Sequence, residues 1–164
     1  MAQQTVTDRP HGRLSFLDSF TAGYSGRREQ EKDVKYLEED YSAALRLAAN
    51  LSSHAKWIPY PFLVNRLRKV ADDVRAQGEL MRARIVELGG IVPQVNIDSR
   101  EDVEFRENVR RLVQDMEEHA ARSEALVHQR NNIRDAGVLK LIGTIASEMQ
   151  KQRDELMDIV MRLS

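Results

Sequence analysis

Residues 138–163, VLKLIGTIASEMQKQRDELMDIVMRL, decide the fold because their apolar side chains recur at alternating steps of four and three. This spacing places those side chains on one face of a long α-helix. The resulting stripe consists of Val138, Ile142, Ile145, Met149, Leu156, Ile159 and Leu163, with Gln152 inside it. A buried amide without a hydrogen-bond partner costs about 1–3 kcal/mol. Gln152 therefore needs an explanation.

The same pattern occurs earlier in the chain, in a helix predicted from about Pro61 to Leu88. Its stripe consists of Val70, Val74, Met81, Ile85 and Leu88, with Gln77 inside it. Each glutamine comes three residues after an apolar side chain, Val74 in one helix and Met149 in the other. We expect the two glutamines to occupy matching positions.

Two more helices are predicted from helical spacing. The first runs from about Arg27 to Ile58 and stops before Pro59, since a proline disfavours α geometry in the residue before it. Its apolar face consists of Leu37, Tyr41, Ala44, Ala48, Leu51, Ala55 and Ile58. The turn that follows carries Trp57, Tyr60 and Phe62, which we expect to plug one end of the core.

The third helix is expected to be capped by Asp98 or Ser99 and to break at Asn131-Asn132. Its predicted inward face consists of Phe105, Val109, Leu112, Met116, Ala120, Ser123 and Val127. Asp135 is placed to cap the fourth helix. Before the third helix, Gly89-Gly90-Ile91 predicts a left-handed helix stop followed by a hydrophobic contact.

Link lengths predict the topology. The links around Pro59 and around Asn131-Asn132 are short, which requires antiparallel neighbours. The middle link, which includes Val92–Ile97, has about nine extended residues and covers roughly 30 Å. We therefore predict an all-α, antiparallel four-helix bundle of two hairpins joined by a crossover, spanning residues 27–164. Residues 1–26 form an N-terminal tail, whose apolar residues either dock onto the bundle or bind a partner: Leu14, Phe16, Leu17 and Phe20.

Composition excludes several classes of function. The 164 residues contain no cysteine, which removes disulfides, thiolate metal sites and cysteine nucleophiles. A net charge of −1 selects neither nucleic acid nor an acidic membrane as a partner. No stretch approaches 18 apolar residues, and the first residues lack the apolar run of a signal peptide. We expect a cytoplasmic protein without nucleic-acid or membrane partners.

Short motifs resemble the ferritin-like superfamily, with bacterioferritins and rubrerythrins as the nearest types. The helix end at Leu88–Ile91, the connection from Asn96-Ile97 into 101–104, and the spacing of Asp40 and Trp57 are similar to those proteins. The resemblance covers about residues 30–163. It implies two helical hairpins with a crossover between the second and third helices.

The same resemblance places two irons between Glu-x-x-His motifs on helices two and four and one Glu on each of the others. The positions of this sequence that match those ligands are Asp40, Val74, Gln77, Met116, Met149 and Gln152. Both histidines and most of the carboxylates are replaced, and no Glu-x-x-His occurs anywhere in the chain. We therefore expect no di-metal centre and no cofactor. The expected function is a non-catalytic structural or protein-interaction unit, and the expected assembly is a homo-oligomer such as a dimer.

An enzyme remains the alternative. Asp40, His54, Glu118 and His119 could form a non-standard iron or manganese site for oxidoreductase chemistry, if His54 and His119 meet near one end of their helices.

Overall fold

The computed structural model describes the backbone of residues 15–97 and 103–164 and the side chains of residues 26–97 and 103–164. In this part of the chain every regular element is a helix. The elements are α1 Ser15–His54, η1 Ala55–Trp57, α2 Pro61–Glu87, α3 Phe105–Gln129, η2 Arg130–Asn132 and α4 Ala136–Leu163. The prediction of an all-α protein with four long helices is confirmed. None of the described helices is long and apolar enough to cross a membrane.

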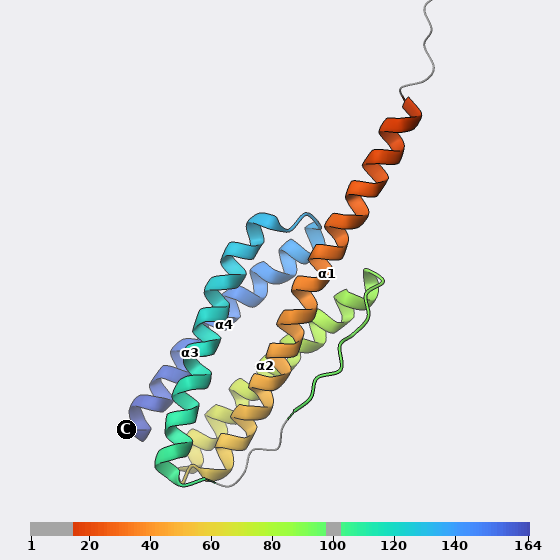
Figure 1. Ribbon diagram of the computed structural model, residues 1–164. Helices are drawn as coiled ribbons and strands as arrows, with labels where there is room; N and C mark the ends of the chain where they lie inside the picture. The colour runs from red at the N-terminus through yellow and green to blue at the C-terminus, as the bar shows by residue number, and fades with distance from the viewer. Residues whose placement is uncertain (1–14, 98–102) are drawn as a thin grey trace, which may run out of the picture.

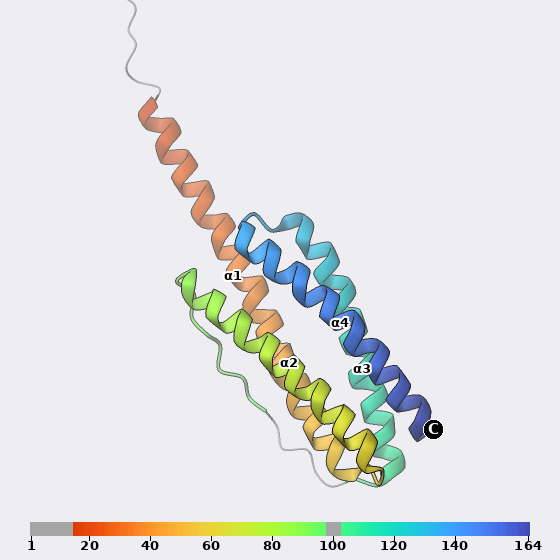
Figure 2. The ribbon, with the colours of Figure 1, turned by 180° about the vertical axis from the view of Figure 1, so that it is seen from behind.

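The helices associate as two pairs. Figures 1 and 2 show α1 beside α2 and α3 beside α4, and these two pairs make the most extensive contacts. Between the pairs, α2 packs against α4 more closely than α1 packs against α3. The extended segment after α2 runs back alongside the α1–α2 pair, where Val92 and Val95 contact the core.

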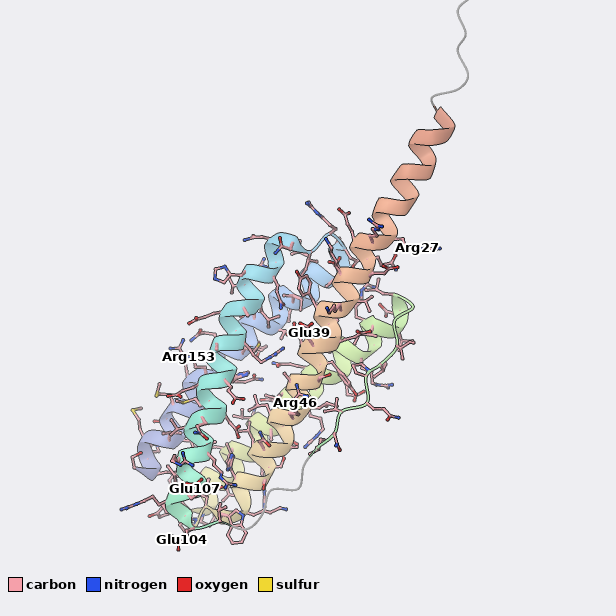
Figure 3. The ribbon with its side chains drawn as sticks, in the orientation of Figure 1. Arg27, Glu39, Arg46, Glu104, Glu107 and Arg153 are labelled. Carbon is pink, nitrogen blue, oxygen red and sulfur yellow. The ribbon has the colours of Figure 1, made fainter. Side chains whose placement is uncertain are left out.

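The first helix is longer than expected. It begins at Ser15 and not near Arg27, so the segment 15–26, expected as a tail, is helical. Gly23 and Gly26 each lower helix stability by about 1 kcal/mol relative to alanine but do not by themselves end a helix. Arg27 lies near one end of the bundle, and the helix before it projects beyond that end (Figure 3).

The expected aromatic plug is wrong. Trp57, Tyr60 and Phe62 are 37%, 47% and 55% exposed. The inward face of α2 begins at Leu63 and continues through Leu67, so Phe62 lies one position off that face. Ile58 and Leu63 are buried in the core near this turn instead.

The inward face of α3 is also rotated from the predicted one. Leu112, Met116 and Ser123 are buried as expected, but Phe105 and Val127 are exposed. The face that the helix buries consists of Asn108, Leu112, Asp115, Met116, His119, Ser123 and Leu126. The predicted caps Asp98 and Ser99 lie outside the described residues. The helix itself starts at Phe105, after Glu104, which makes no side-chain capping bond.

The stripes of α2 and α4 are buried as predicted, including Gln77 and Gln152, except that Leu88 and Leu163 at their ends are only partly buried. The buried apolar residues form two clusters. The first cluster contains Leu51, Leu67, Val74, Met116 and Leu156, among others, and includes the residues next to the α1–α2 turn. The second cluster contains Leu37, Met81, Leu126, Ile142 and Met149, among others, and includes the residues next to the α3–α4 turn.

The end of α2 follows the predicted glycine stop. Gly89 has a φ of 76°, its N–H donates to Val86 O at 2.9 Å, and the Gly90 N–H donates to Ile85 O at 2.8 Å. These two bonds define a Schellman motif. The hydrophobic contact expected from Ile91 is absent, because that side chain is 85% exposed. The Asp135 cap of α4 is confirmed by a bond of 2.8 Å from Val138 N–H.

Gly90→Ala tests how closely α1 approaches this turn. A Cβ at Gly90 would lie 2.6 Å from Val34 Cγ1 and 2.9 Å from Ile85 Cγ2, and both neighbours are β-branched and stiff. We expect a loss of about 1–3 kcal/mol in the free energy of unfolding, measured in urea. Gly26→Ala is the control, because it is helical with nothing within 4 Å. It should stabilise by about 0.5–1 kcal/mol. Equal effects of the two changes would contradict the close contact.

Candidate functional site

A polar layer crosses the bundle between the two apolar clusters. Each long helix contributes one buried polar residue to it: Asp40 from α1, Gln77 from α2, His119 from α3 and Gln152 from α4. Their exposed fractions are 4%, 8%, 3% and 5%. On α2, α3 and α4, one of the two apolar clusters ends three positions before the layer residue of that helix. On α2, for example, Val74 is the last residue of the first cluster and Gln77 comes three positions later.

A small cavity lies in this layer. Its free space is about 20 Å³, enough for one water-sized species. Polar groups on the lining come from Asp40, Gln77, His119 and Arg122. The remaining lining residues are apolar: Ala43, Ala44, Leu47, Val74, Met81, Leu126 and Met149.

Asp40 is held by one strong partner. The Arg122 guanidinium on α3 donates to Asp40 Oδ1, while Asp40 Oδ2 is buried without a hydrogen-bond partner. Burial raises the pKa of Asp40 to about 6, although Arg122 opposes this rise. Glu39, the preceding residue on α1 (Figure 3), adds a smaller increase to the pKa. The carboxyl group is thus much easier to protonate than an exposed aspartate.

The pKa of His119 is shifted in the opposite direction. Burial lowers the pKa of His119 to about 4, so the ring is neutral at neutral pH. Gln152 and the Met149 carbonyl lie beside the ring and favour its charged form, whereas Arg122 disfavours it. Neither His119 Nε2 nor Gln152 Oε1 has a hydrogen bond of ordinary geometry.

The structure brings together most of the positions that match ferritin-like ligands. Asp40, Val74, Gln77 and Met149 all line the cavity, and Gln152 lies beside His119. Met116 does not line it and packs in the first apolar cluster. The contribution of α3 comes instead from His119, which the sequence placed with Asp40 only in the alternative metal set, and from Arg122, which the sequence analysis did not assign to a site. The two glutamines share no hydrogen bond among those found in the described residues.

The alternative metal set is not assembled. Asp40 and His119 share the cavity, but Glu118 is exposed and His54 contacts Asp115 and Asn108 instead. Across residues 26–97 and 103–164, no three histidine, aspartate or glutamate side chains are grouped so that they could hold a metal ion.

The contact of His54 defines a second buried polar cluster, between α1 and α3. Its Nε2 lies 2.8 Å from Asp115 Oδ2 and its Nδ1 lies 2.6 Å from Asn108 Oδ1. Asn108 Nδ2 donates to the His54 carbonyl at 3.1 Å, which orients the amide oxygen towards the ring. Both ring nitrogens thus lie within hydrogen-bonding distance of side-chain oxygens on α3. Asn50 Nδ2 donates to Asp115 Oδ1 at 3.1 Å.

Sequence reasoning missed Asn108 and Asp115, although their spacing carried a signal. Asn108, Asp115, His119 and Ser123 lie seven, four and four residues apart, which is helical spacing for one face. That face competed with the more apolar stripe through Phe105 and Val109, one position away. The apolar stripe was preferred because polar residues are usually exposed.

Comparison of the chain with models of protein families, with curated proteins and with solved structures finds no match to any of them. The functional argument therefore depends on the chain's own residues.

Asp40→Asn and His119→Gln test the opposed pKa shifts. The folded chain keeps the Asp40 proton up to about pH 6 while the unfolded chain loses it near 3.8, so this group's contribution to stability falls as pH rises between them. For His119 the unfolded chain gains a proton near 6.5 and the folded chain near 4, so its contribution falls as pH drops. In the wild type the two effects offset each other.

Relative to wild type, we expect His119→Gln to lose stability as pH rises from 4 to 6. Asp40→Asn should lose it as pH falls from 6.5 to 4. Each change should amount to roughly 2–3 kcal/mol, because a pKa change of one corresponds to about 1.4 kcal/mol. Urea unfolding at a series of pH values measures both slopes. Parallel curves for all three proteins would contradict the shifts.

Asp115→Leu tests the second cluster. Removing the carboxylate takes away the oxygen that lies 2.8 Å from His54 Nε2, and breaking a buried pair in this way costs about 3–5 kcal/mol. His54→Leu with Asp115→Leu removes both partners and should cost less than the sum of the single changes. A double-mutant cycle from urea unfolding gives the coupling energy, which we expect to exceed about 1 kcal/mol. Additive effects would show that the two groups do not interact.

Proposed function

We propose that this protein is a ferritin-like bundle without a standard di-metal centre, working as a non-catalytic protein-interaction unit. In this proposal the hairpins α1–α2 and α3–α4 are each antiparallel, and the segment between Leu88 and Glu104 is the crossover. The short turns within the pairs and the path of the segment after α2 support this topology.

The donor set of the cavity supports the lack of a di-metal centre. Such centres use four carboxylates and two histidines. Here Val74 and Met149 replace two ligands, and Gln77 stands where a histidine would be. The one carboxylate, Asp40, already pairs with the Arg122 guanidinium. One carboxylate cannot balance two divalent ions, so these residues do not fit the group.

The observation that carries the interaction role is an exposed aromatic end. We define the aromatic end as Trp57, Tyr60, Phe62 and Phe105. Of the six aromatic side chains in the described residues, only Tyr36 and Tyr41 lie outside this group. All four members are at least 37% exposed.

These residues belong to the α1–α2 turn and to the start of α3, which meet at one end of the bundle (Figure 1). Glu104 and Glu107, which flank Phe105, lie at the end where the α1–α2 turn is drawn (Figure 3). Large exposed apolar groups gathered in one place mark interaction surfaces, since single scattered ones are the norm. The aromatic end is therefore the contact surface that we assign to this protein.

We take a second copy of the chain as the partner. Exposed charges of both signs flank the aromatic end. Lys56 and Arg106 are positive, and Glu104 is negative. A self-complementary contact needs both signs, because two copies present the same surface to each other. The expected product is a homodimer joined end to end.

Phe62→Ser combined with Phe105→Ser tests this assignment by sedimentation velocity over a range of protein concentrations. We expect the wild type to form dimers and the double variant to weaken association at least about tenfold, since truncating central aromatic residues of an interface costs about 2 kcal/mol or more. Leu80→Ser is the matched control, because Leu80 is 54% exposed and Phe62 is 55% exposed. It should leave association unchanged.

A second readout comes from Trp57, the only tryptophan of the chain. Its fluorescence should shift to shorter wavelength as dimers form, because the contact removes the indole from water. A wild-type protein that stays monomeric with unchanged emission at every concentration would overturn the homodimer.

A further inference from the structure

A larger hollow lies on the surface where the link between α3 and α4 meets α1, at the end of the bundle opposite the aromatic end (Figure 1). Its volume is about 530 Å³, which is within the range of small-molecule sites. The charged and amide side chains on its lining are Glu29, Lys32, Lys35 and Glu39 from α1, and Asn132 and Arg134 from the link. No aliphatic residue lines it, so it favours a polar ligand.

A buried carboxylate fixes the shape of this hollow. Asp33 is 1% exposed, and its Oδ2 accepts hydrogen bonds from the Arg134 N–H at 3.2 Å and from the Asp135 N–H at 2.9 Å. Bonds in which the acceptor is ionised are roughly twice as strong as neutral ones. Because Lys32 precedes Asp33 in the chain, these bonds hold the backbone that carries Lys32 beside the backbone that carries Arg134. The hollow is therefore formed before any ligand binds.

Three cations of the hollow have no acidic partner. Lys32, Lys35 and Arg134 are exposed, and none of their side chains makes an ion pair or a hydrogen bond to another described residue. Lys32 and Lys35 are three positions apart on one helix, a spacing at which like charges repel each other. Arg134 adds a third positive charge from the facing link. An anion bound among the three side chains relieves this repulsion.

The donors favour a phosphate group. A guanidinium donates two parallel hydrogen bonds to phosphate oxygens, and an ammonium is a point charge with three donors. A phosphate monoester carries a charge of about −1.5 to −2 at pH 7, so it balances several cations at once. Glu29 and Glu39 lie one helical turn before Lys32 and one turn after Lys35. Their carboxylates are acceptors, which suit hydroxyl groups on the rest of the ligand.

We propose that this hollow binds a small phosphate ester that carries hydroxyl groups, the chemistry of a sugar phosphate. The phosphate binds among Lys32, Lys35 and Arg134, and the hydroxyl groups donate to Glu29 and Glu39. The net charge of −1 on the chain does not oppose this binding, because salt screens charges that lie more than about 8–10 Å apart. The site does not depend on the homodimer proposed above.

Titration of the full chain with ribose 5-phosphate tests the proposal, with calorimetry for the affinity and amide NMR for the location. We expect one ligand per chain, an affinity that falls as salt is added, and shifted amide signals at Lys32, Asn132 and Arg134. Arg134→Gln should weaken binding about tenfold, because it removes the group that binds two phosphate oxygens. Lys35→Gln should weaken it about fivefold, since it removes one charge.

Arg46→Gln is the matched control. Arg46 is exposed on α1, makes no ion pair with a described residue, and lies seven positions beyond Glu39 (Figure 3). It should bind ribose 5-phosphate as the wild type does. Circular dichroism confirms that each variant is folded, and Lys35→Gln keeps the test valid if Arg134→Gln fails to fold.

Two further ligands separate the parts of the proposal. Ribose alone should not bind, and inorganic phosphate should bind more weakly than ribose 5-phosphate. Absence of binding by the wild type at about 10 mM ribose 5-phosphate would overturn the site. Equal losses from Arg134→Gln and Arg46→Gln would overturn it as well, since they would indicate attraction to the overall charge. Inorganic phosphate or ribose that binds as tightly as ribose 5-phosphate would contradict a phosphate ester as the ligand.

Discussion

The rest of the structure depends on the polar layer that crosses the middle of the bundle. A carboxylate, an imidazole and two amides cannot be buried against hydrocarbon without cost, so the four helices must hold registers that bring these groups to one level. The apolar core is divided as a result into two clusters, one on each side of the layer. The contact between Asp40 and Arg122 joins α1 to α3 at this level.

The interface between α1 and α3 is polar, whereas the interface between α1 and α2 is apolar and close. A Cβ at Gly78 would lie 3.8 Å from Ala44 Cβ, which shows how near α1 and α2 approach. Between α1 and α3 the described side-chain bonds come from Asp40, Asn50 and His54. Apolar contact stabilises the pair α1–α2, and polar contacts with fixed geometry then select how α3 lies against it. Buried polar groups have this role of specifying one arrangement in several proteins.

The helices were predictable because three of the four have strong apolar stripes with caps and prolines at their ends. Asp135, Pro61 and Gly89 mark element ends in both the sequence and the structure. The site was predictable in part, because the burial of Gln77 and Gln152 follows from their spacing within the apolar stripes. Arg122 and Asp115 were not predictable, because a charged residue on a helix is usually exposed to water and only the partner on another helix explains its position.

The same reasoning explains why the layer and the aromatic end belong to one account of function. Both are places where the chain departs from the arrangement that would maximise stability: unpartnered atoms inside at the layer, and large apolar rings outside at the α1–α2 turn. A leucine in place of Gln152 would complete an unbroken stripe on α4, and polar side chains in place of Phe62 would suit water better. Departures of this kind are expected at functional sites, where a ligand or a partner restores the missing interactions. In the isolated chain, the exposed rings call for a second protein surface.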